Sequence, residues 1–251
     1  MPRTPEKPGN EFRLFHLLPN MVTIAAICAG MTSIRFGIQG NYELSAQLIL
    51  AASVLDGVDG RLARLLKSKS KLGAELDSLA DFANFGVAPA LVIYFWALQD
   101  LPRAGWIAVL VFAVCTVIRL ARFNVSNGED STGSSDRNFT GVPAPAGALL
   151  ALLPMYLSFA FSDAALVHEG LVSIYLIGVG MLMISRVPTF SPKSITISRQ
   201  NVRYFLVGFA FLGAAVLSFP WETLLGLCLI YLGTVFWAMF SGRAIGQPRE
   251  A

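Results

Sequence analysis

The chain is poor in charged residues, cysteine and histidine, and each scarcity argues against a class of protein. Asp, Glu, Lys and Arg make up only 14% of the 251 residues, whereas they make up about a quarter of a typical soluble domain. The three cysteines, Cys28, Cys115 and Cys228, stand alone in apolar stretches, so neither a disulfide framework nor a zinc site is expected. His16 and His168 lie too far apart to suggest a catalytic dyad. A net charge of +3 is too small to indicate a nucleic-acid-binding protein.

Long hydrophobic runs take up most of the chain instead. Hydrophobic residues make up 55% of the sequence, with 18 Phe and a mean hydropathy of +0.61, a composition that opposes disorder. A helix of about 20 apolar residues crosses a hydrocarbon core ~30 Å thick. Segments of roughly this length fall at 17–37, 42–66, 73–97, 104–124, 142–162, 167–184, 202–219 and 221–241. We therefore predict an all-α polytopic membrane protein with about eight transmembrane helices.

The distribution of Lys and Arg predicts the orientation of these helices. If the N-terminus is cytoplasmic, all of the 19 Lys and Arg residues except Arg35 and Arg103 fall on the cytoplasmic side. This asymmetry follows the positive-inside rule and favours an even number of spans. We expect a cytoplasmic N-terminal arm at 1–16, a transmembrane domain at 17–241 and a cytoplasmic tail at 242–251.

Four aspartates interrupt the second and third apolar segments. A carboxylate at the centre of a membrane span costs ~2.5–3.5 kcal/mol on insertion scales, so such residues are usually functional. Asp56 and Asp59 are three positions apart and Asp77 and Asp81 are four apart, so each pair shares one face of a helix. The short basic link around 67–71 makes the two helices antiparallel neighbours. We therefore expect all four carboxylates to converge near the cytoplasmic side.

Four converging carboxylates without His or Cys form a hard oxygen site, which suits Mg²⁺ or Mn²⁺, and two such cations could share it. A buried ion-pair network is the structural alternative, but Arg61 and Arg64 cannot balance four aspartates together with Glu75. A cation transporter is the functional alternative. Transporters usually contain internal repeats or broken helices, and the sequence shows neither.

Small residues and an arginine accompany the aspartates at fixed spacing. Gly60, Ala63 and Gly73 leave room for a ligand beside the backbone, and Arg64 offers several donors to a phosphate. The stretch DGVDGRLAR at 56–64, followed by GAELDSLAD at 73–81, resembles the signature of the CDP-alcohol phosphatidyltransferase family, D-x2-D-G-x2-A-R-x8-G-x3-D-x3-D. Every fixed position of that signature matches, which makes the resemblance highly specific.

Further stretches are similar to the bacterial integral-membrane phosphatidylserine synthases of that family. They are LPNMVT at 18–23, RLARFN at 119–124, FTGVPAPAGA at 139–148 and SRVPTFSPK at 185–193. The resemblance implies transfer of a phosphatidyl group from CDP-diacylglycerol to L-serine in phospholipid biosynthesis, which gives phosphatidylserine and CMP. Another acceptor, such as glycerol 3-phosphate, an inositol or choline, remains the alternative. The resemblance also implies a homodimer in the bacterial inner membrane, with its active site at the cytoplasmic face.

The resemblance assigns roles to residues of this chain. It implies that the divalent cations are held by Asp56, Asp59, Asp77 and Asp81, and that Asp81 is also the general base for the acceptor hydroxyl. It implies that the CDP-lipid is bound by Asn20, Thr23, Gly60, Ala63, Arg64 and Gly73.

The carboxylate of serine requires a cation near Asp81, and the sequence offers several. Arg119 and Arg122 end the fourth apolar segment, with Asn124 just beyond them, and Lys193 follows the sixth. These four residues are our candidates for serine binding. Long basic side chains at the end of a span also reach the headgroup region without any functional role, so this alternative stays open for both arginines.

Overall fold

The computed structural model describes residues 17–66, 70–128, 141–161, 168–185 and 202–241. Its elements are all helical: α1 Leu18–Ile38, α2 Tyr42–Leu65, α3 Lys71–Asp81, the π-helical η2 Phe82–Val87, α4 Ala88–Ile93, the π-helical η3 Tyr94–Leu98, α5 Pro102–Gly128, α6 Ala144–Ala151, α7 Leu153–Phe161, α8 Glu169–Ile184, α9 Val202–Ser218 and α10 Pro220–Ser241. The predicted arm at 1–16, the predicted tail at 242–251 and Lys193 lie outside the described residues.

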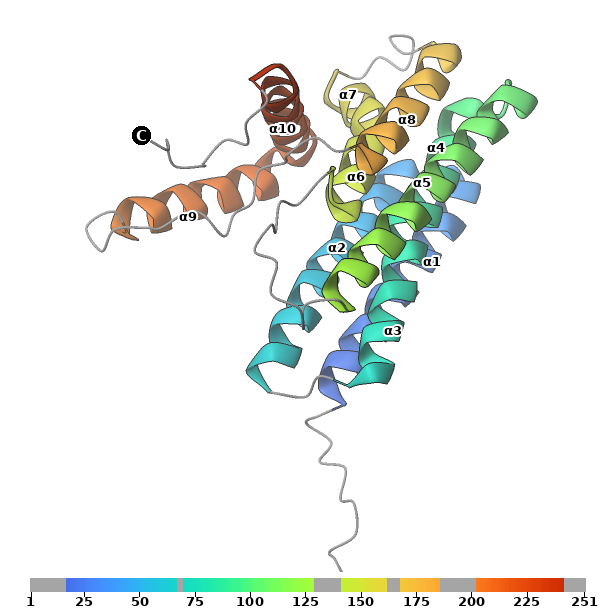
Figure 1. Cartoon of the computed structure of the whole chain (residues 1–251). Helices are drawn as coiled ribbons and strands as arrows, with labels where there is room; N and C mark the ends of the chain where they lie inside the picture. The colour runs from blue at the N-terminus through green and yellow to red at the C-terminus, as the bar shows by residue number, and fades with distance from the viewer. Residues whose placement is uncertain (1–16, 67–69, 129–140, 162–167, 186–201, 242–251) are drawn as a thin grey trace, which may run out of the picture.

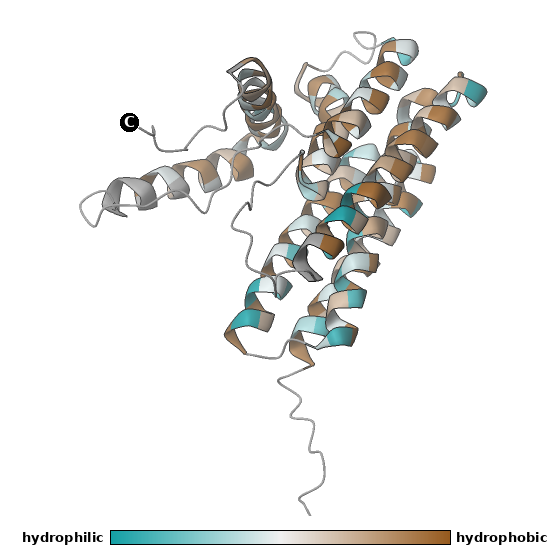
Figure 2. Ribbon diagram, viewed as in Figure 1, coloured by the Kyte–Doolittle hydropathy of each residue, from teal (hydrophilic) through white to brown (hydrophobic). Residues whose placement is uncertain are grey.

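Among the described residues, five helical stretches are long and apolar enough to cross a membrane: Leu18–Ile38, Lys71–Leu98, Pro102–Val125, Ala144–Phe161 and Pro220–Phe240. Helix α2 has the length of a span but contains several charged residues, and α8 is apolar but has only 16 residues. Large apolar side chains such as Val54, Ile174 and Phe236 face outward, and Figure 2 shows that hydrophobic residues are frequent along the helices. The described residues therefore confirm an all-helical, polytopic membrane architecture.

Helices α1 and α2 form a tightly packed antiparallel pair (Figure 1). The turn between them contains Gly40, whose φ of +79° is a conformation that glycine adopts without strain. Asn41 then caps α2, because its side chain accepts a hydrogen bond from the Leu44 backbone N–H. Ser45 donates to the Ser33 carbonyl oxygen at 2.7 Å. Small and hydroxyl residues therefore let the two backbones approach closely, as is common between membrane helices.

The third apolar stretch, Lys71–Leu98, is one long helix with two π-helical segments. Ser70 caps its start, since its hydroxyl accepts a hydrogen bond from the Gly73 N–H at 3.0 Å. The first π-helical segment, Phe82–Val87, begins directly after Asp81 and ends shortly before Pro89. Proline interrupts the regular hydrogen bonding of an α-helix, and π-helical turns occur frequently at functional sites.

The remaining helices build the rest of the bundle around this core. Helix α5 packs along α8 and against the π-helical segment η2, while α10 packs against α7. In Figure 1, α9 extends away from the bundle, and α10 connects it to the other helices. Phe112, Met155, Tyr156 and Met183 are fully buried in the main apolar core of the bundle.

Replacing Gly180 with Leu should destabilise the packing of α5 on α8. A Cβ added at Gly180 would lie 3.3 Å from the Phe112 Cα and 3.4 Å from the Cys115 Sγ. A larger side chain must therefore separate the helices, which lowers the free energy of unfolding by about 1–3 kcal/mol. Gly178 on the same helix has nothing within 4 Å of its added Cβ, so Gly178→Leu is the matched control. Thermal unfolding in detergent should give a lower Tm for Gly180→Leu alone, and equal Tm values would contradict this packing.

Candidate active site

Three of the predicted carboxylates meet between α2 and α3. One carboxylate oxygen from each of Asp56, Asp59 and Asp77 lies within 4.8 Å of the other two. Asp59 is almost fully buried, with 2% of its surface exposed, while Asp77 is exposed. The convergence predicted from the spacing in the sequence is therefore confirmed for these three residues. We call Asp56, Asp59 and Asp77 the carboxylate cluster.

Asp81 lies beside this cluster rather than within it. It follows Asp77 by one helical turn on the same face of α3, and its carboxyl group is within hydrogen-bonding reach of the Asp56 carboxyl group. The π-helical segment η2 begins at the next residue. Asp81 thus borders the cluster beside Asp56, at the point where the helix changes its winding.

Helix α1 orients the most buried aspartate. Thr23 donates a hydrogen bond from its hydroxyl to the Asp59 Oδ2, at 2.6 Å. The other oxygen of the same carboxylate, Oδ1, is buried and has no hydrogen-bond partner among the described residues. A buried carboxylate oxygen without a partner is strongly unfavourable, and a bound cation would satisfy it.

The electrostatics of the site fit a divalent cation better than an internal ion-pair network. The four carboxylates interact with one another and with hydroxyl and backbone groups, and no ion pair to Lys or Arg is found for them among the described residues. Arg64, one of the two arginines considered for such a network, donates instead to the Gly60 carbonyl oxygen at 3.0 Å. An oxygen-only set of ligands is the kind that Mg²⁺ and Mn²⁺ prefer.

Small residues leave open space beside the cluster. A Cβ added at Gly60 would have only the Arg64 Nη2 as a neighbour, at 4.0 Å. A Cβ added at Gly73 would lie 3.0 Å from the Asn20 Oδ1, so glycine at this position lets α1 and α3 approach each other. Ala63 is half-buried. The residues that the resemblance assigns to the CDP-lipid therefore come from the neighbouring ends of α1, α2 and α3.

The candidate serine-binding residues differ in what they contact. The Arg119 Nε donates to the Val142 carbonyl oxygen at 3.2 Å, and its guanidinium interacts electrostatically with Asp81. The Arg122 Nη1 donates to the Ile184 carbonyl oxygen at 2.9 Å, so this side chain caps the end of α8. Arg119 is therefore better placed than Arg122 to meet an acceptor near Asp81.

Two polar residues at this site escaped the sequence analysis. Ser78 accepts a hydrogen bond from the Asn124 Nδ2 at 2.6 Å, which ties the end of α5 to α3 beside Asp77. Asn84 is fully buried, and neither polar atom of its amide has a partner among the described residues. Its amide lies against Gly30 of α1, and its position three residues after Asp81 is the sequence signal that could have identified it.

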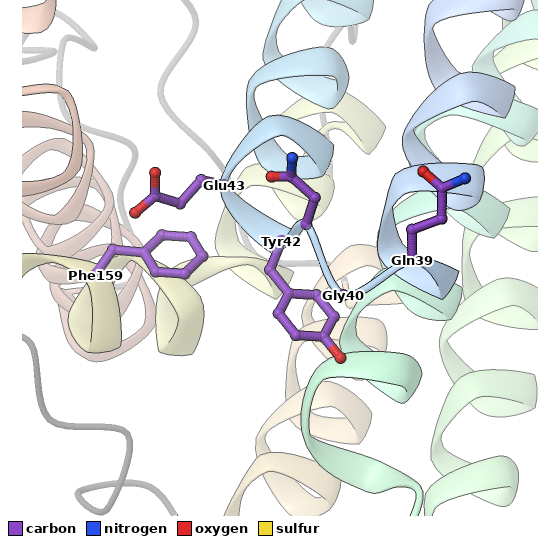
Figure 3. Close-up of a pocket in the computed structure, with 6 residues that line it drawn as sticks. Gln39, Gly40, Tyr42, Glu43 and Phe159 are labelled. Carbon is purple, nitrogen blue, oxygen red and sulfur yellow. The ribbon is translucent and has the colours of Figure 1, made fainter.

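A hollow in the surface lies at the turn between α1 and α2, the end of α2 remote from the aspartates. Figure 3 shows it between this turn and Phe159 of α7. Its lining includes a single ionisable carboxylate, that of Glu43. One exposed carboxylate without a second acid or a buried polar partner does not make a metal or phosphate site, so the carboxylate cluster remains the candidate active site.

Comparison with known proteins agrees with the geometry of this site. The model of the CDP-alcohol phosphatidyltransferase family matches residues 16–185. A CDP-diacylglycerol–serine O-phosphatidyltransferase of Mycobacterium leprae is 38% identical over 236 residues, which cover 94% of this chain and 78% of that relative. The protein of the same name from Helicobacter pylori is 36% identical over 240 residues, covering 94% of this chain and 97% of the relative. A family match over residues 16–185, together with relatives at 36–38% identity over most of the chain, shows that the chain belongs to the CDP-alcohol phosphatidyltransferase family.

Proposed function

We propose that this chain is a CDP-diacylglycerol–serine O-phosphatidyltransferase, a transferase of phospholipid biosynthesis. It would transfer the phosphatidyl group of CDP-diacylglycerol to the hydroxyl of L-serine and release CMP. The observation that carries the proposal is the carboxylate cluster, whose partly buried oxygens require a divalent cation. The names of the relatives, which match over most of this chain, supply the acceptor.

We assign Asp56, Asp59, Asp77 and Asp81 to two divalent cations, Mg²⁺ or Mn²⁺. Such ions would neutralise the diphosphate of the lipid substrate and the charge that develops on the leaving CMP. The Thr23 hydroxyl holds the Asp59 carboxylate in one orientation, which leaves its second oxygen for a ligand. The chain's own contribution is therefore mainly to position charge around the reacting phosphorus.

We assign the role of general base to Asp81. In this step the serine hydroxyl loses its proton to the Asp81 carboxylate, and its oxygen forms a bond to the β-phosphorus. The bond from that phosphorus to the phosphate oxygen of CMP breaks, and CMP leaves. Asp81 suits this role because it borders the cluster without belonging to it, so its carboxylate can reach an acceptor placed beside the diphosphate.

We assign the CDP-lipid to Asn20, Thr23, Gly60, Ala63, Arg64 and Gly73. Serine would be held by Arg119, with Arg122, Asn124 and Lys193 as further candidates. Arg119 has the strongest support, because it interacts with Asp81 while its Nε is fixed by the Val142 carbonyl oxygen.

We further propose that residues 17–241 form a single transmembrane domain of eight helices in the bacterial inner membrane, as a homodimer among the membrane lipids. The arm at 1–16 and the tail at 242–251 would both be cytoplasmic, as would the active site. The distribution of Lys and Arg supports this orientation.

A fluorescent reporter that matures only in the cytoplasm, fused after Ala251, should fluoresce if the C-terminus is cytoplasmic. A fusion that stays dark would place the C-terminus on the opposite side of the membrane.

The purified protein should release CMP from CDP-diacylglycerol only when L-serine and Mg²⁺ or Mn²⁺ are present. Phosphatidylserine should form in equal amount, and chelation of the cation should abolish turnover because the carboxylates then repel the diphosphate. Asp81→Asn should lower kcat by at least about 100-fold, the contribution of a general base. If CMP release depends instead on glycerol 3-phosphate, an inositol or choline, that compound and not serine is the acceptor. Full activity of Asp81→Asn would remove the assignment of the base.

Gly60→Ala should weaken binding of the CDP-lipid without destabilising the fold. The added methyl group has no neighbour closer than 4.0 Å, and alanine stabilises a helix relative to glycine by roughly 0.5–1 kcal/mol. If the diphosphate lies against Gly60, the methyl group overlaps it, and the KM for CDP-diacylglycerol should rise at least about fivefold. Gly57→Ala, which also meets nothing within 4 Å, is the matched control. An unchanged KM in Gly60→Ala would place the diphosphate elsewhere.

A further inference from the structure

Helix α5 packs along the long helix that carries the third and fourth aspartates, and it contacts that helix at two levels. Leu120 shares a small apolar cluster with Phe85 of the π-helical segment η2. One turn later along α5, the Asn124 Nδ2 donates a hydrogen bond to the Ser78 Oγ of α3 at 2.6 Å. The first contact is apolar and the second is polar. We call Ser78 and Asn124 the polar pair.

The polar pair contributes little to holding the two helices together. Asn124 is exposed and Ser78 is half-buried, so water competes for the same groups, and such a hydrogen bond has a net value of only about 0.5–1.5 kcal/mol. The bond uses one amide N–H of Asn124 and one lone pair of the Ser78 Oγ. The Asn124 Oδ1 and the second lone pair of the Ser78 Oγ therefore remain as acceptors for a ligand.

Asp81 lies between Asp77 and Ser78 around the axis of α3. At roughly 100° per residue, Asp81 is about 40° from Asp77 and about 60° from Ser78. Asp77 belongs to the carboxylate cluster, whereas Ser78 faces α5 through its hydrogen bond with Asn124. The Asp81 side chain therefore borders the carboxylate cluster on one side and the polar pair on the other.

The geometry of phosphoryl transfer favours an acceptor on the side of the polar pair. In such a reaction the attacking and leaving oxygens lie roughly in line through the phosphorus. The residues that we assign to the CDP-lipid come from α1, α2 and the start of α3, so the acceptor would approach from the opposite side, next to α5. Serine carries its ammonium group on the carbon next to the one that bears its hydroxyl group. An acceptor whose hydroxyl meets Asp81 therefore brings its ammonium group near the polar pair.

We propose that the Asn124 Oδ1 and the Ser78 Oγ accept hydrogen bonds from the ammonium group of the acceptor amino acid, so that the polar pair determines acceptor specificity. This proposal rests on the proposed function above. A primary ammonium group has three N–H donors. Glycerol 3-phosphate and inositols carry no ammonium group, and the quaternary nitrogen of choline has no N–H to donate. The polar pair therefore favours serine over each of these acceptors.

Steady-state kinetics of Ser78→Ala and Asn124→Leu test the proposal. Loss of a hydrogen bond to a charged group should raise the KM for L-serine about tenfold or more in each variant, while the KM for CDP-diacylglycerol stays within about twofold. Two fragments of serine identify the group that is bound. Inhibition by 2-aminoethanol, which keeps the ammonium group, should weaken in both variants as serine binding does. Inhibition by 3-hydroxypropanoate, which lacks the ammonium group, should not change.

Ser45→Ala is the matched control. The Ser45 Oγ also donates a hydrogen bond between two helices, to the Ser33 carbonyl oxygen at 2.7 Å, but it lies at the end of α2 remote from the aspartates. This variant should lower the Tm and leave both KM values unchanged.

Three results would overturn the proposal while leaving the enzyme's activity established. They are an unchanged KM for serine in either variant of the polar pair, an equal rise in both KM values, and weaker inhibition by 3-hydroxypropanoate. Absence of serine-dependent turnover in the wild-type protein would instead overturn the proposed function itself.

Discussion

The burial of carboxylates between apolar helices is the constraint on which the site depends. Asp59 is 2% exposed and retains an oxygen without a partner, and its neighbours add like charge rather than relieve it. Such a group is strongly destabilising unless a cation neutralises it. The surrounding structure fits this requirement, because Thr23 fixes one oxygen and Gly60 keeps the space beside the cluster open. The proposed binding of a divalent cation and of a diphosphate would then depend on the same residues.

Much of the fold could be predicted because the membrane leaves few alternatives to apolar helices. The predicted segments 17–37 and 73–97 correspond closely to Leu18–Ile38 and Lys71–Leu98. Hydropathy could not show that the second of these contains two π-helical segments, since winding depends on local hydrogen bonding and on Pro89. It also could not settle the role of α2, whose functional charges make it less apolar than a typical span.

The site could be predicted where spacing along one helix determines it. Asp56 and Asp59 share one face of α2, and the short link to α3 brings Asp77 beside them, so this part of the prediction is confirmed. Contacts between helices distant in the sequence could not be predicted in the same way. The hydrogen bond from Arg122 to Ile184, for example, has no periodic signal, because it depends on how α5 packs against α8.

Binding of Mn²⁺ by the purified protein, followed by electron paramagnetic resonance without lipid substrate, tests the central role of the carboxylate cluster most directly. The account predicts bound Mn²⁺ in the wild-type protein and at least about tenfold weaker binding in Asp59→Asn, which removes a buried ligand. Glu75→Gln removes an exposed carboxylate from the same region of α3 and should bind Mn²⁺ as the wild type does. Equal binding by Asp59→Asn and the wild type would contradict the account.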